Sequence, residues 1–432
     1  MIFMPFQILG LWLRGLVALA LIGLAAYLLR EWHQRATTVY EPLPAAVAAG
    51  EPQTDPVLQK PGGAGPRSEV VVRRARAVPL SEWRPGWDVP TAMLAGGLLL
   101  AGLAAGGGSL AWPLLRRRGD DEPSADRGGV VERIRRPDGS ELQVEMYGPA
   151  EAPPLVVVHG WGSDATEWYY LKKQLGGRFR LITWDLPGLG LSKGPDNNDY
   201  SVEKMARDLE AVIERTAIGP VVMLGHSIGG MICLTYCRLF HETLAAKVSG
   251  MILVHTTPTN PVRTTQYSGL YTALQKPVVE PLLYLTIGLA PLVWLMNWLS
   301  YLNGSLQRST AKSSFAGNET RGQVDFVARF MLKAWPAVLA RGMFGMLRYD
   351  ASATLQTIEI PTLVVSGDRD TTTLPEASEW MRRDIPNARL VALAPARHMG
   401  LIERNDQFSD LVAEFVNMHT PKVGSTSAGR SL

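Results

Sequence analysis

The sequence predicts an α/β fold with a mostly parallel central sheet, preceded by two transmembrane helices. From residue 130 onward, short apolar runs alternate with segments of helical periodicity, a pattern typical of a parallel sheet with helices on both faces. Within it, Ser227 stands between an apolar run and a helix-like segment, with Gly225 and Gly229 on either side. Two long stretches before residue 116 that carry almost no charge predict the membrane helices.

The chain begins with an apolar stretch long enough to span a membrane. Arg14 is the one charge within residues 11–29, and a hydrocarbon core of about 30 Å needs roughly 20 apolar residues. We interpret residues 1–29 as a transmembrane helix and not as a cleaved signal peptide, because no charged region precedes the run and the run is longer than a typical signal core. Arg14 is expected to extend to the lipid headgroups.

Residues 91–115 carry no charge and predict a second transmembrane helix. They are rich in glycine and alanine, which allow helices to pack closely in lipid. The intervening residues 30–90 are rich in proline and alanine and predict an extended loop. Two spans put the N-terminus and the rest of the chain on one side, and the arginines at 116–118 favour the cytoplasm, although arginines in the loop oppose part of this bias.

The globular part is expected to follow a linker of residues 116–129. The residues at 137–140 read Pro-Asp-Gly-Ser, a turn signal that predicts an antiparallel hairpin. Ser201 is expected to cap an amphipathic helix, a last helix covers 406–418, and residues 419–432 are predicted to be disordered. The predicted strands cover residues 130–136, 141–147, 155–158, 179–184, 221–224, 250–255, 361–365 and 389–393.

Four motifs stand at the ends of predicted strands. They are His-Gly-Trp-Gly at 159–162, Gly-His-Ser-Ile-Gly at 225–229, Ser-Gly-Asp-Arg-Asp at 366–370 and Ala-Arg-His-Met-Gly at 396–400. In this order they resemble the α/β-hydrolase family, in which a G-x-S-x-G nucleophile elbow is followed along the chain by an acid and then by a histidine. The resemblance covers residues 130–418.

The resemblance implies a role for each of five residues. Ser227 is expected to be the nucleophile, His398 the base that takes its proton, and Asp370 the acid that orients the imidazole. The backbone N–H groups of Trp161 and Ile228 are expected to form the oxyanion hole. This chemistry needs no cofactor and no metal.

Some positions near these motifs depart from the family pattern or have a structural interpretation. Arg397 precedes the histidine where the family usually has glycine, and Pro375 follows the acid one residue later than is common. Asp185 begins a D-x-x-G-x-G-x-S motif, which in the family shapes a loop beside the site. His255 ends a predicted strand and is interpreted as a hydrogen-bonded structural histidine, with lining of the pocket as the alternative.

Roughly 100 residues separate the strand at 250–255 from the strand at 361–365, where a simple crossover needs a dozen or more. We therefore assign residues 258–350 to a helical cap and residues 130–257 and 351–418 to the hydrolase core. Residues 281–296 are apolar on nearly all sides. A third transmembrane span there would separate Ser227 from His398 across the bilayer, so we expect cap helices that either touch the membrane interface or are ordinary cap core.

Composition argues against two further classes, nucleic-acid-binding proteins and disulfide-stabilised proteins. A net charge of +3, without a basic run interleaved with aromatic residues, gives no support to nucleic-acid binding. Cys233 and Cys237 lie on one face of a predicted helix, which indicates small core residues and not a disulfide framework.

The sequence therefore predicts an integral membrane serine hydrolase that cleaves carboxylic esters, with a lipophilic, acylglycerol-like substrate and membrane lipid as its partners. Ser227 argues against epoxide hydrolysis and dehalogenation, which use a carboxylate nucleophile in the family. Carbon–carbon bond hydrolysis, acyl transfer and peroxidation use serine on this fold and stay open as alternatives. A non-catalytic ligand-binding protein on the same fold is a further alternative.

Overall fold

The computed structural model of the chain describes residues 5–42, 73–115 and 117–420. By their internal contacts the residues form two compact units. One unit is residues 19–105, and the other joins residues 1–18 to residues 106–432. The predicted disordered tail lies almost wholly outside the described residues.

The unit of residues 19–105 is built from parts of two helices and a short ribbon. Helix α1 (Pro5–Ala36) ends later than residue 29, because the polar residues that follow the apolar run are good helix formers. The predicted loop also contains regular structure: β1 (Thr38–Pro42) pairs antiparallel with β2 (Arg73–Ala77). The described ends of the predicted loop therefore pair with each other, which the composition did not indicate.

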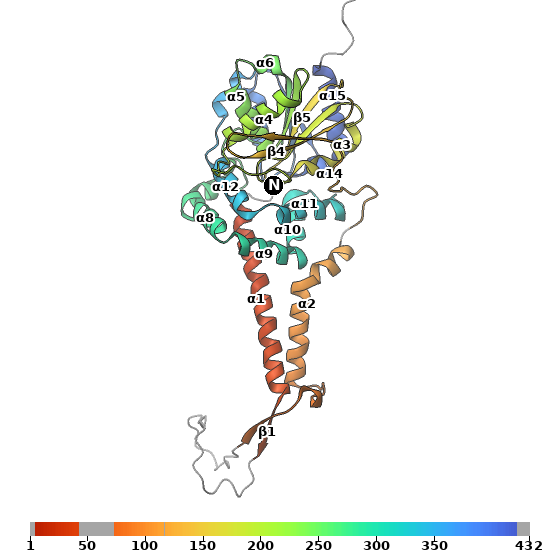
Figure 1. Cartoon of the computed structure of the whole chain (residues 1–432), viewed down its shortest axis with the longest axis vertical. Coiled ribbons are helices and arrows are strands. Elements are labelled where there is room, and N and C mark those ends of the chain that lie inside the picture. Colours follow the sequence, from red (N-terminus) through yellow and green to blue (C-terminus); the bar gives the residue numbers. More distant parts are fainter. Residues whose placement is uncertain (1–4, 43–72, 116, 421–432) are drawn as a thin grey trace, which may run out of the picture. The chain divides into compact units, whose positions relative to one another are not determined.

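In this unit, helices α1 and α2 (Val89–Leu115) lie side by side (Figure 1). Gly97 of α2 allows the close approach, since an added Cβ would lie 2.8 Å from Leu29 of α1. One helix stretch, Trp12–Ala36, is long and apolar enough to span a membrane. The described apolar stretch of α2, Val89–Ala104, is too short for that test, so the second span stays a prediction.

The other unit contains an eight-stranded sheet in the order β10-β9-β8-β7-β5-β6-β4-β3. Strands β3 and β4 pair antiparallel, as the predicted hairpin requires, and β4 also pairs antiparallel with β6. The other neighbouring strands of this sheet are parallel. The mostly parallel sheet is confirmed. Its strands are β3 (Val130–Arg135), β4 (Glu141–Tyr147), β5 (Pro154–Val158), β6 (Arg180–Trp184), β7 (Val221–His226), β8 (Val248–Val254), β9 (Thr362–Gly367) and β10 (Ala388–Leu393).

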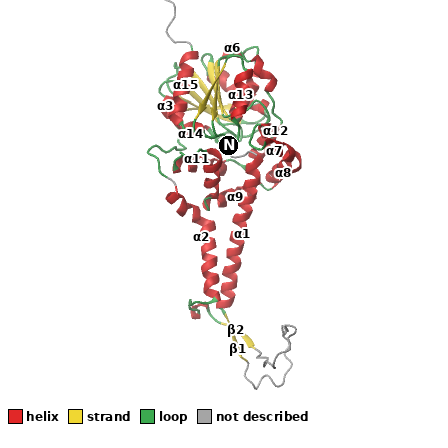
Figure 2. Cartoon of the chain, turned by 180° about the vertical axis from the view of Figure 1, so that it is seen from behind, coloured by secondary structure: helices red, strands yellow, loops and turns green. Residues whose placement is uncertain are grey.

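Helices cover both faces of this sheet. Helices α3 and α15 lie on one side, and α4 and α5 lie on the other (Figures 1 and 2). Ser201 caps α4 as predicted, because its hydroxyl accepts a hydrogen bond from the Lys204 amide at 3.2 Å. The helices of the core are α3 (Tyr169–Leu175), α4 (Val202–Thr216), α5 (Ile228–Leu239), α6 (Leu244–Lys247), α13 (Pro375–Asp384), α14 (Gly400–Glu403) and α15 (Asn405–His419).

Between β8 and β9 the chain forms the predicted helical insertion. Its apolar stretch is not one helix, because α8 and α9 meet at a 97° bend, where Gly288 is the last residue of α8 and Pro291 lies in the first turn of α9. The insertion contains α7 (Ser268–Leu274), α8 (Glu280–Gly288), α9 (Ala290–Leu302), α10 (Ser305–Ser314), α11 (Arg321–Lys333) and α12 (Pro336–Leu347).

Candidate active site

Ser227 lies in a strained turn between β7 and α5. Its φ of 55° and ψ of −117° are rare for a residue with a side chain, and its amide is held by the Val254 carbonyl at 2.9 Å. Glycine is required beside it: a Cβ on Gly229 would lie 2.2 Å from the Val158 carbonyl oxygen. The turn therefore has the geometry of a nucleophile elbow.

His398 and Asp370 are brought together from two separate loops. His398 Nδ1 lies 2.5 Å from Asp370 Oδ2, and both side chains are buried. The Thr372 amide and the Thr373 hydroxyl donate to the same carboxylate at 2.8 and 2.9 Å. These contacts fix the carboxylate, which in turn fixes the orientation of the imidazole.

The remaining nitrogen of His398 has no hydrogen-bond partner among the described residues. This nitrogen, Nε2, is buried, and the Ser227 side chain is buried as well. The nucleophile turn and the His398 loop touch through His226, whose Nε2 lies 3.2 Å from the His398 carbonyl oxygen. A serine and an unsatisfied imidazole nitrogen thus occupy adjoining elements.

His255 adds a second imidazole to this carboxylate. Its Nδ1 lies 3.3 Å from Asp370 Oδ2, and its backbone has a φ of 45° just after β8. It is fully buried, and neither ring nitrogen has a hydrogen bond to a described residue. His255 therefore packs against Asp370. The interpretation of His255 as a hydrogen-bonded structural histidine is not supported, because its ring makes no hydrogen bond with a described residue.

Burial and charge act in opposite directions on these groups. Burial lowers the pKa of His398 below its ordinary value, although Asp370 acts against it. Burial raises the pKa of Asp370, but His398 and His255 outweigh it and hold this pKa below the ordinary range. The pair is therefore a carboxylate and a neutral imidazole, which is the charge state that a general base requires.

Spacing alone would also allow an ion here. Ligand atoms of His255, Asp370 and His398 all lie within 4.8 Å of one another. The Asp370 oxygen that faces the two histidines already accepts the Thr373 hydroxyl as well. This donor set suits a hydrogen-bonded carboxylate better than a metal ligand.

The two residues expected to form the oxyanion hole lie at the carboxyl ends of neighbouring strands. Trp161 follows β5, and its amide makes no hydrogen bond with a described residue. Its indole is anchored in the insertion, where Nε1 donates to the Leu339 carbonyl at 3.0 Å. Ile228 is the first residue of α5, and the first amides of a helix have no partner within it. Both amides are available to an oxyanion.

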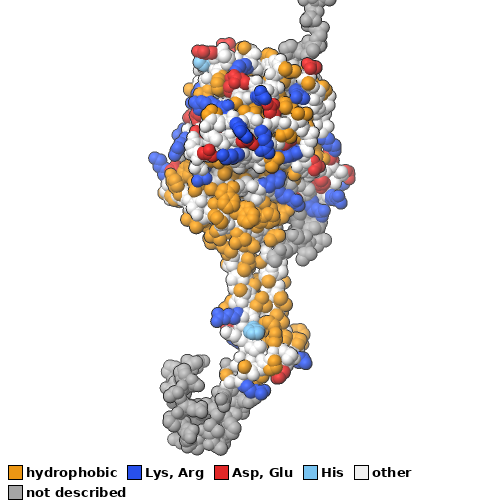
Figure 3. Space-filling view, viewed as in Figure 1, with side chains coloured by type: hydrophobic (Ala, Val, Ile, Leu, Met, Phe, Trp, Pro, Cys, Tyr) orange, Lys and Arg blue, Asp and Glu red, His pale blue; other side chains and the backbone are white. Residues whose placement is uncertain are grey.

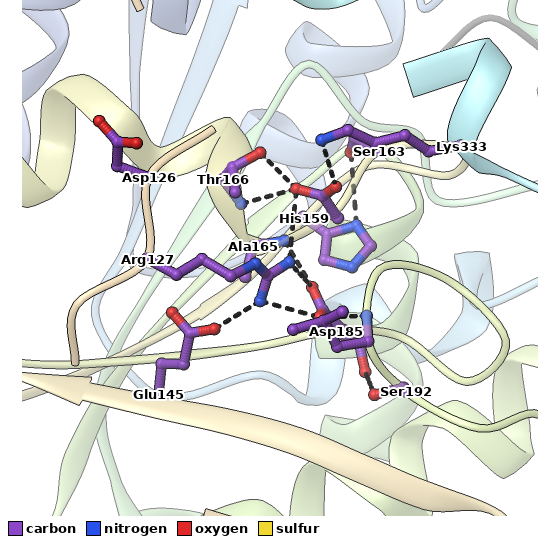
Figure 4. A network of polar contacts seen from close by, with 12 residues as sticks. Asp126, Arg127, Glu145, His159, Ser163, Ala165, Thr166, Asp185, Ser192 and Lys333 are labelled. Atoms are coloured by element: carbon purple, nitrogen blue, oxygen red, sulfur yellow. Dashed lines mark hydrogen bonds and ion pairs between the residues drawn. The ribbon is translucent and has the colours of Figure 1, made fainter. Parts of the chain in front are cut away.

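A buried polar network holds the loop that follows Trp161 (Figure 4). Asp185 accepts from the Ala165 amide at 2.7 Å and from the Leu191 amide at 2.8 Å, and Arg127 contacts the same carboxylate at 3.0 Å. This is the structural role expected of Asp185. The predicted linker, however, supplies Arg127 as a partly buried partner, so it does more than connect two parts of the chain.

Sequence reasoning missed one pair in this region. Glu167 is fully buried, and it accepts from the Gly160 amide at 2.8 Å and lies 2.9 Å from His226 Nδ1. No spacing connects Glu167 to the nucleophile motif, because the contact joins segments that are distant in sequence. Glu167 stands among polar and aromatic residues at 163–170, so no local signal in the sequence indicated its burial.

Known proteins with a similar sequence or fold include esterases and a peptidase. Relatives include a pimeloyl-(acyl-carrier protein) methyl ester esterase of Nitrosospira multiformis, 25% identical over 63% of this chain and 97% of the relative. A proline iminopeptidase of Lactobacillus helveticus is 25% identical over 65% of this chain and 96% of the relative. The thermophilic esterase of Thermogutta terrifontis has the same fold, with a TM-score of 0.53 and 22% identity over 68% of this chain and all of that chain.

A family model extends over most of the globular part. Residues 155–411 match the model of the alpha/beta hydrolase family. The match begins in β5, before the Trp161 loop, and ends in α15, after His398, so it includes every motif described above. From the sheet order, the strained serine turn and this match, the chain belongs to the alpha/beta hydrolase family.

Proposed function

We propose that this protein is a serine hydrolase that cleaves carboxylic esters through an acyl-enzyme on Ser227. The observation that carries the proposal is the buried 2.5 Å contact between His398 Nδ1 and Asp370 Oδ2, which leaves His398 Nε2 unsatisfied next to the strained serine turn. The esterases among the relatives support an ester as substrate.

The proposed reaction follows from these groups. His398 Nε2 takes the proton of the Ser227 hydroxyl as its oxygen attacks the ester carbonyl, and the imidazolium is stabilised by Asp370. The amides of Trp161 and Ile228 donate to the oxyanion of the tetrahedral intermediate. His398 then gives the proton to the leaving alcohol, and the acyl-enzyme remains. In the second half, His398 takes a proton from water as the water attacks the acyl group, and it returns this proton to the Ser227 oxygen as the acid is released.

The proposal includes membrane attachment and a lipophilic substrate. The apolar helix stretch Trp12–Ala36 supports a first membrane span, and the apolar composition of residues 91–115 supports a second. The arginines at 116–118 support a cytoplasmic hydrolase part. We further propose residues 130–257 and 351–418 as the catalytic core, and residues 258–350 as a cap over an apolar, acylglycerol-like substrate.

A series of p-nitrophenyl esters tests both the reaction and the substrate class. With the detergent-solubilised full chain, we expect kcat/KM to rise with acyl length, by roughly fourfold for each CH₂ that becomes buried. Turnover of the shortest esters alone would show that the substrate is small. Failure to turn over any ester would exclude the proposed function and favour carbon–carbon bond hydrolysis or ligand binding.

The charge state of His398 predicts the pH dependence. His398 must be neutral to take the serine proton, and burial lowers its pKa below the ordinary value of 6.5. Protonation, and with it the loss of activity, is therefore shifted to lower pH. We expect kcat/KM for a soluble ester to stay level from pH 8 to below 6.5 and to fall only at more acidic pH. A half-maximal point above pH 6.5 would contradict this charge state.

A further inference from the structure

The two helices on either side of the 97° bend, α8 and α9, form what we call the cap corner. Residues 281–302 of this corner contain no charged side chain. Figure 3 shows hydrophobic side chains gathered over this part of the molecule. Six large hydrophobic residues of the corner are between 37% and 63% exposed: Tyr284, Leu285, Leu289, Leu292, Trp294 and Leu295.

Helix α9 has one apolar face that packs inside the protein and a second apolar face that is exposed. Helix α9 already buries Val293 and Met296, and Trp294 is fixed by a hydrogen bond from Nε1 to the Leu332 carbonyl at 3.2 Å. Contiguous exposed apolar surface is rare on monomeric soluble proteins and marks a binding surface. The cap corner therefore has a partner that tolerates no charge.

The start of α1 indicates what this partner is. The candidate span begins at Trp12, and Trp12 Nε1 donates to the Thr286 hydroxyl of α8 at 3.2 Å. A Cβ on Gly15 would lie 2.0 Å from the Met296 side chain of α9, so α1 and the corner are in direct contact. Arg14 donates to Ser309 of α10 at 2.9 Å, and this bond replaces the contact with headgroups expected from the sequence.

We propose that the cap corner lies in the headgroup–acyl boundary of the bilayer that α1 enters. Exposed tryptophan and tyrosine beside leucine, without charge, is the composition of segments at this depth. In this position a lipid ester would reach the cap directly from the membrane. This route of substrate entry rests on the proposed function. The start of α1 packs against α8 and α9, so the bilayer that α1 enters lies beside the corner. A soluble protein partner would not account for this position.

A single-cysteine probe tests this placement without using activity. Cys233 and Cys237 are buried, and burial raises the pKa of both thiols, so neither competes for a label. Leu295→Cys and Leu191→Cys would each carry an environment-sensitive fluorophore in the full chain, reconstituted in phosphatidylcholine nanodiscs with or without doxyl-labelled lipid. Leu191 is a matched control because it is also an exposed leucine, but it belongs to the proposed catalytic core and not to the cap corner.

We expect doxyl lipid to quench the probe at position 295 at least several-fold more than the probe at position 191. Equal, weak quenching at both positions would overturn the proposal. A second measurement replaces Leu292 and Leu295 with aspartate and compares a vesicle-embedded ester with a soluble short-chain ester. We expect about a tenfold loss on the vesicle ester alone, because charges are excluded from the acyl region. Equal losses on both esters would also overturn it.

The two hypotheses fail differently. If the wild-type chain hydrolyses no ester, the proposed function is wrong, but strong quenching at position 295 still supports the membrane placement. If the soluble ester is hydrolysed and the probe is not quenched, the proposed function stands and the placement is wrong.

A second inference rests on an independent observation, the hydrogen bonds of His226. Its Nδ1 faces Glu167 Oε1 at 2.9 Å, and its Nε2 faces the His398 carbonyl oxygen at 3.2 Å. A carboxylate and a carbonyl both accept hydrogen bonds, so His226 bridges two acceptors from separate segments of the chain. Burial raises the pKa of Glu167, but the interaction with His226 outweighs it and lowers this pKa to about 2.

The geometry assigns Glu167 and His226 as a buried pair that positions the active site. Glu167 holds the Gly160 amide, next to the amide of Trp161, and His226 holds the loop that carries His398. Both are positioning residues, since neither is placed to touch the substrate. The other titratable groups around His226 are the rings of His255 and His398, at 5.9 and 5.5 Å.

Glu167→Gln tests the pair, with Glu210→Gln as control, because Glu210 is also buried but bonds to Tyr236. A carboxamide has one oxygen in place of two, so it cannot accept from the Gly160 amide through one oxygen and face His226 through another, as Glu167 does. We expect kcat on a soluble ester to fall at least several-fold in Glu167→Gln, with little change in KM or in melting temperature, and to stay near the wild-type value in the control. A wild-type kcat in Glu167→Gln, or an equal loss in the control, would overturn the assignment.

Discussion

Replacing Ser227 with alanine is expected to abolish ester turnover while the protein stays folded. Loss of the nucleophile from a serine triad lowers kcat by a factor on the order of 10⁶. Alanine is no larger than serine and meets the same backbone strain at a φ of 55°, and the turn is held by the Ser227 amide, which the substitution leaves in place. The measurement is kcat on a p-nitrophenyl ester, together with the melting temperature of each protein.

Ser409→Ala provides a matched control for this variant. Ser409 is also buried, and its hydroxyl makes no hydrogen bond with a described residue. It lies in α15, away from the turn that carries Ser227. We expect turnover close to that of the wild type for Ser409→Ala. Near-normal turnover by Ser227→Ala would contradict the acyl-enzyme mechanism, whereas a large fall in melting temperature would show that the loss is structural.

The parts of this site that could be predicted from the sequence are those encoded within a few residues. The turn around Ser227 was predictable because a strand, two glycines and a helix are contiguous along the chain. The mostly parallel sheet was predictable because each strand is a short apolar run, and the strand boundaries differ from the predicted ones by a few residues.

The parts that could not be predicted depend on contacts between distant segments. Arg127 was interpreted as a linker residue, because nothing near it in sequence indicates Asp185 as its partner. The same holds for Glu167 with His226. The bend between α8 and α9 was not predicted for a different reason. The apolar composition of the stretch decided the interpretation, and the signals for a helix end at Gly288 and for a helix start at Pro291, in the first turn of α9, were not used.

Asp370→Asn is the second substitution expected to have a large effect. Asp370 keeps the Nδ1 proton of His398 in place and stabilises the imidazolium that forms during attack, and an amide can stabilise the wrong tautomer instead. We expect kcat to fall by a factor on the order of 10⁴. Since asparagine has nearly the same shape, KM for a soluble ester is expected to change little, so that the loss appears in kcat.

Asp368→Asn separates this effect from a general effect of charge. Asp368 lies two residues away, but it accepts a hydrogen bond from the Ala396 amide at 2.8 Å and does not contact His398. We expect this variant to retain most of its turnover. If Asp368→Asn were the inactive variant and Asp370→Asn the active one, Asp368 would be the acid of the triad.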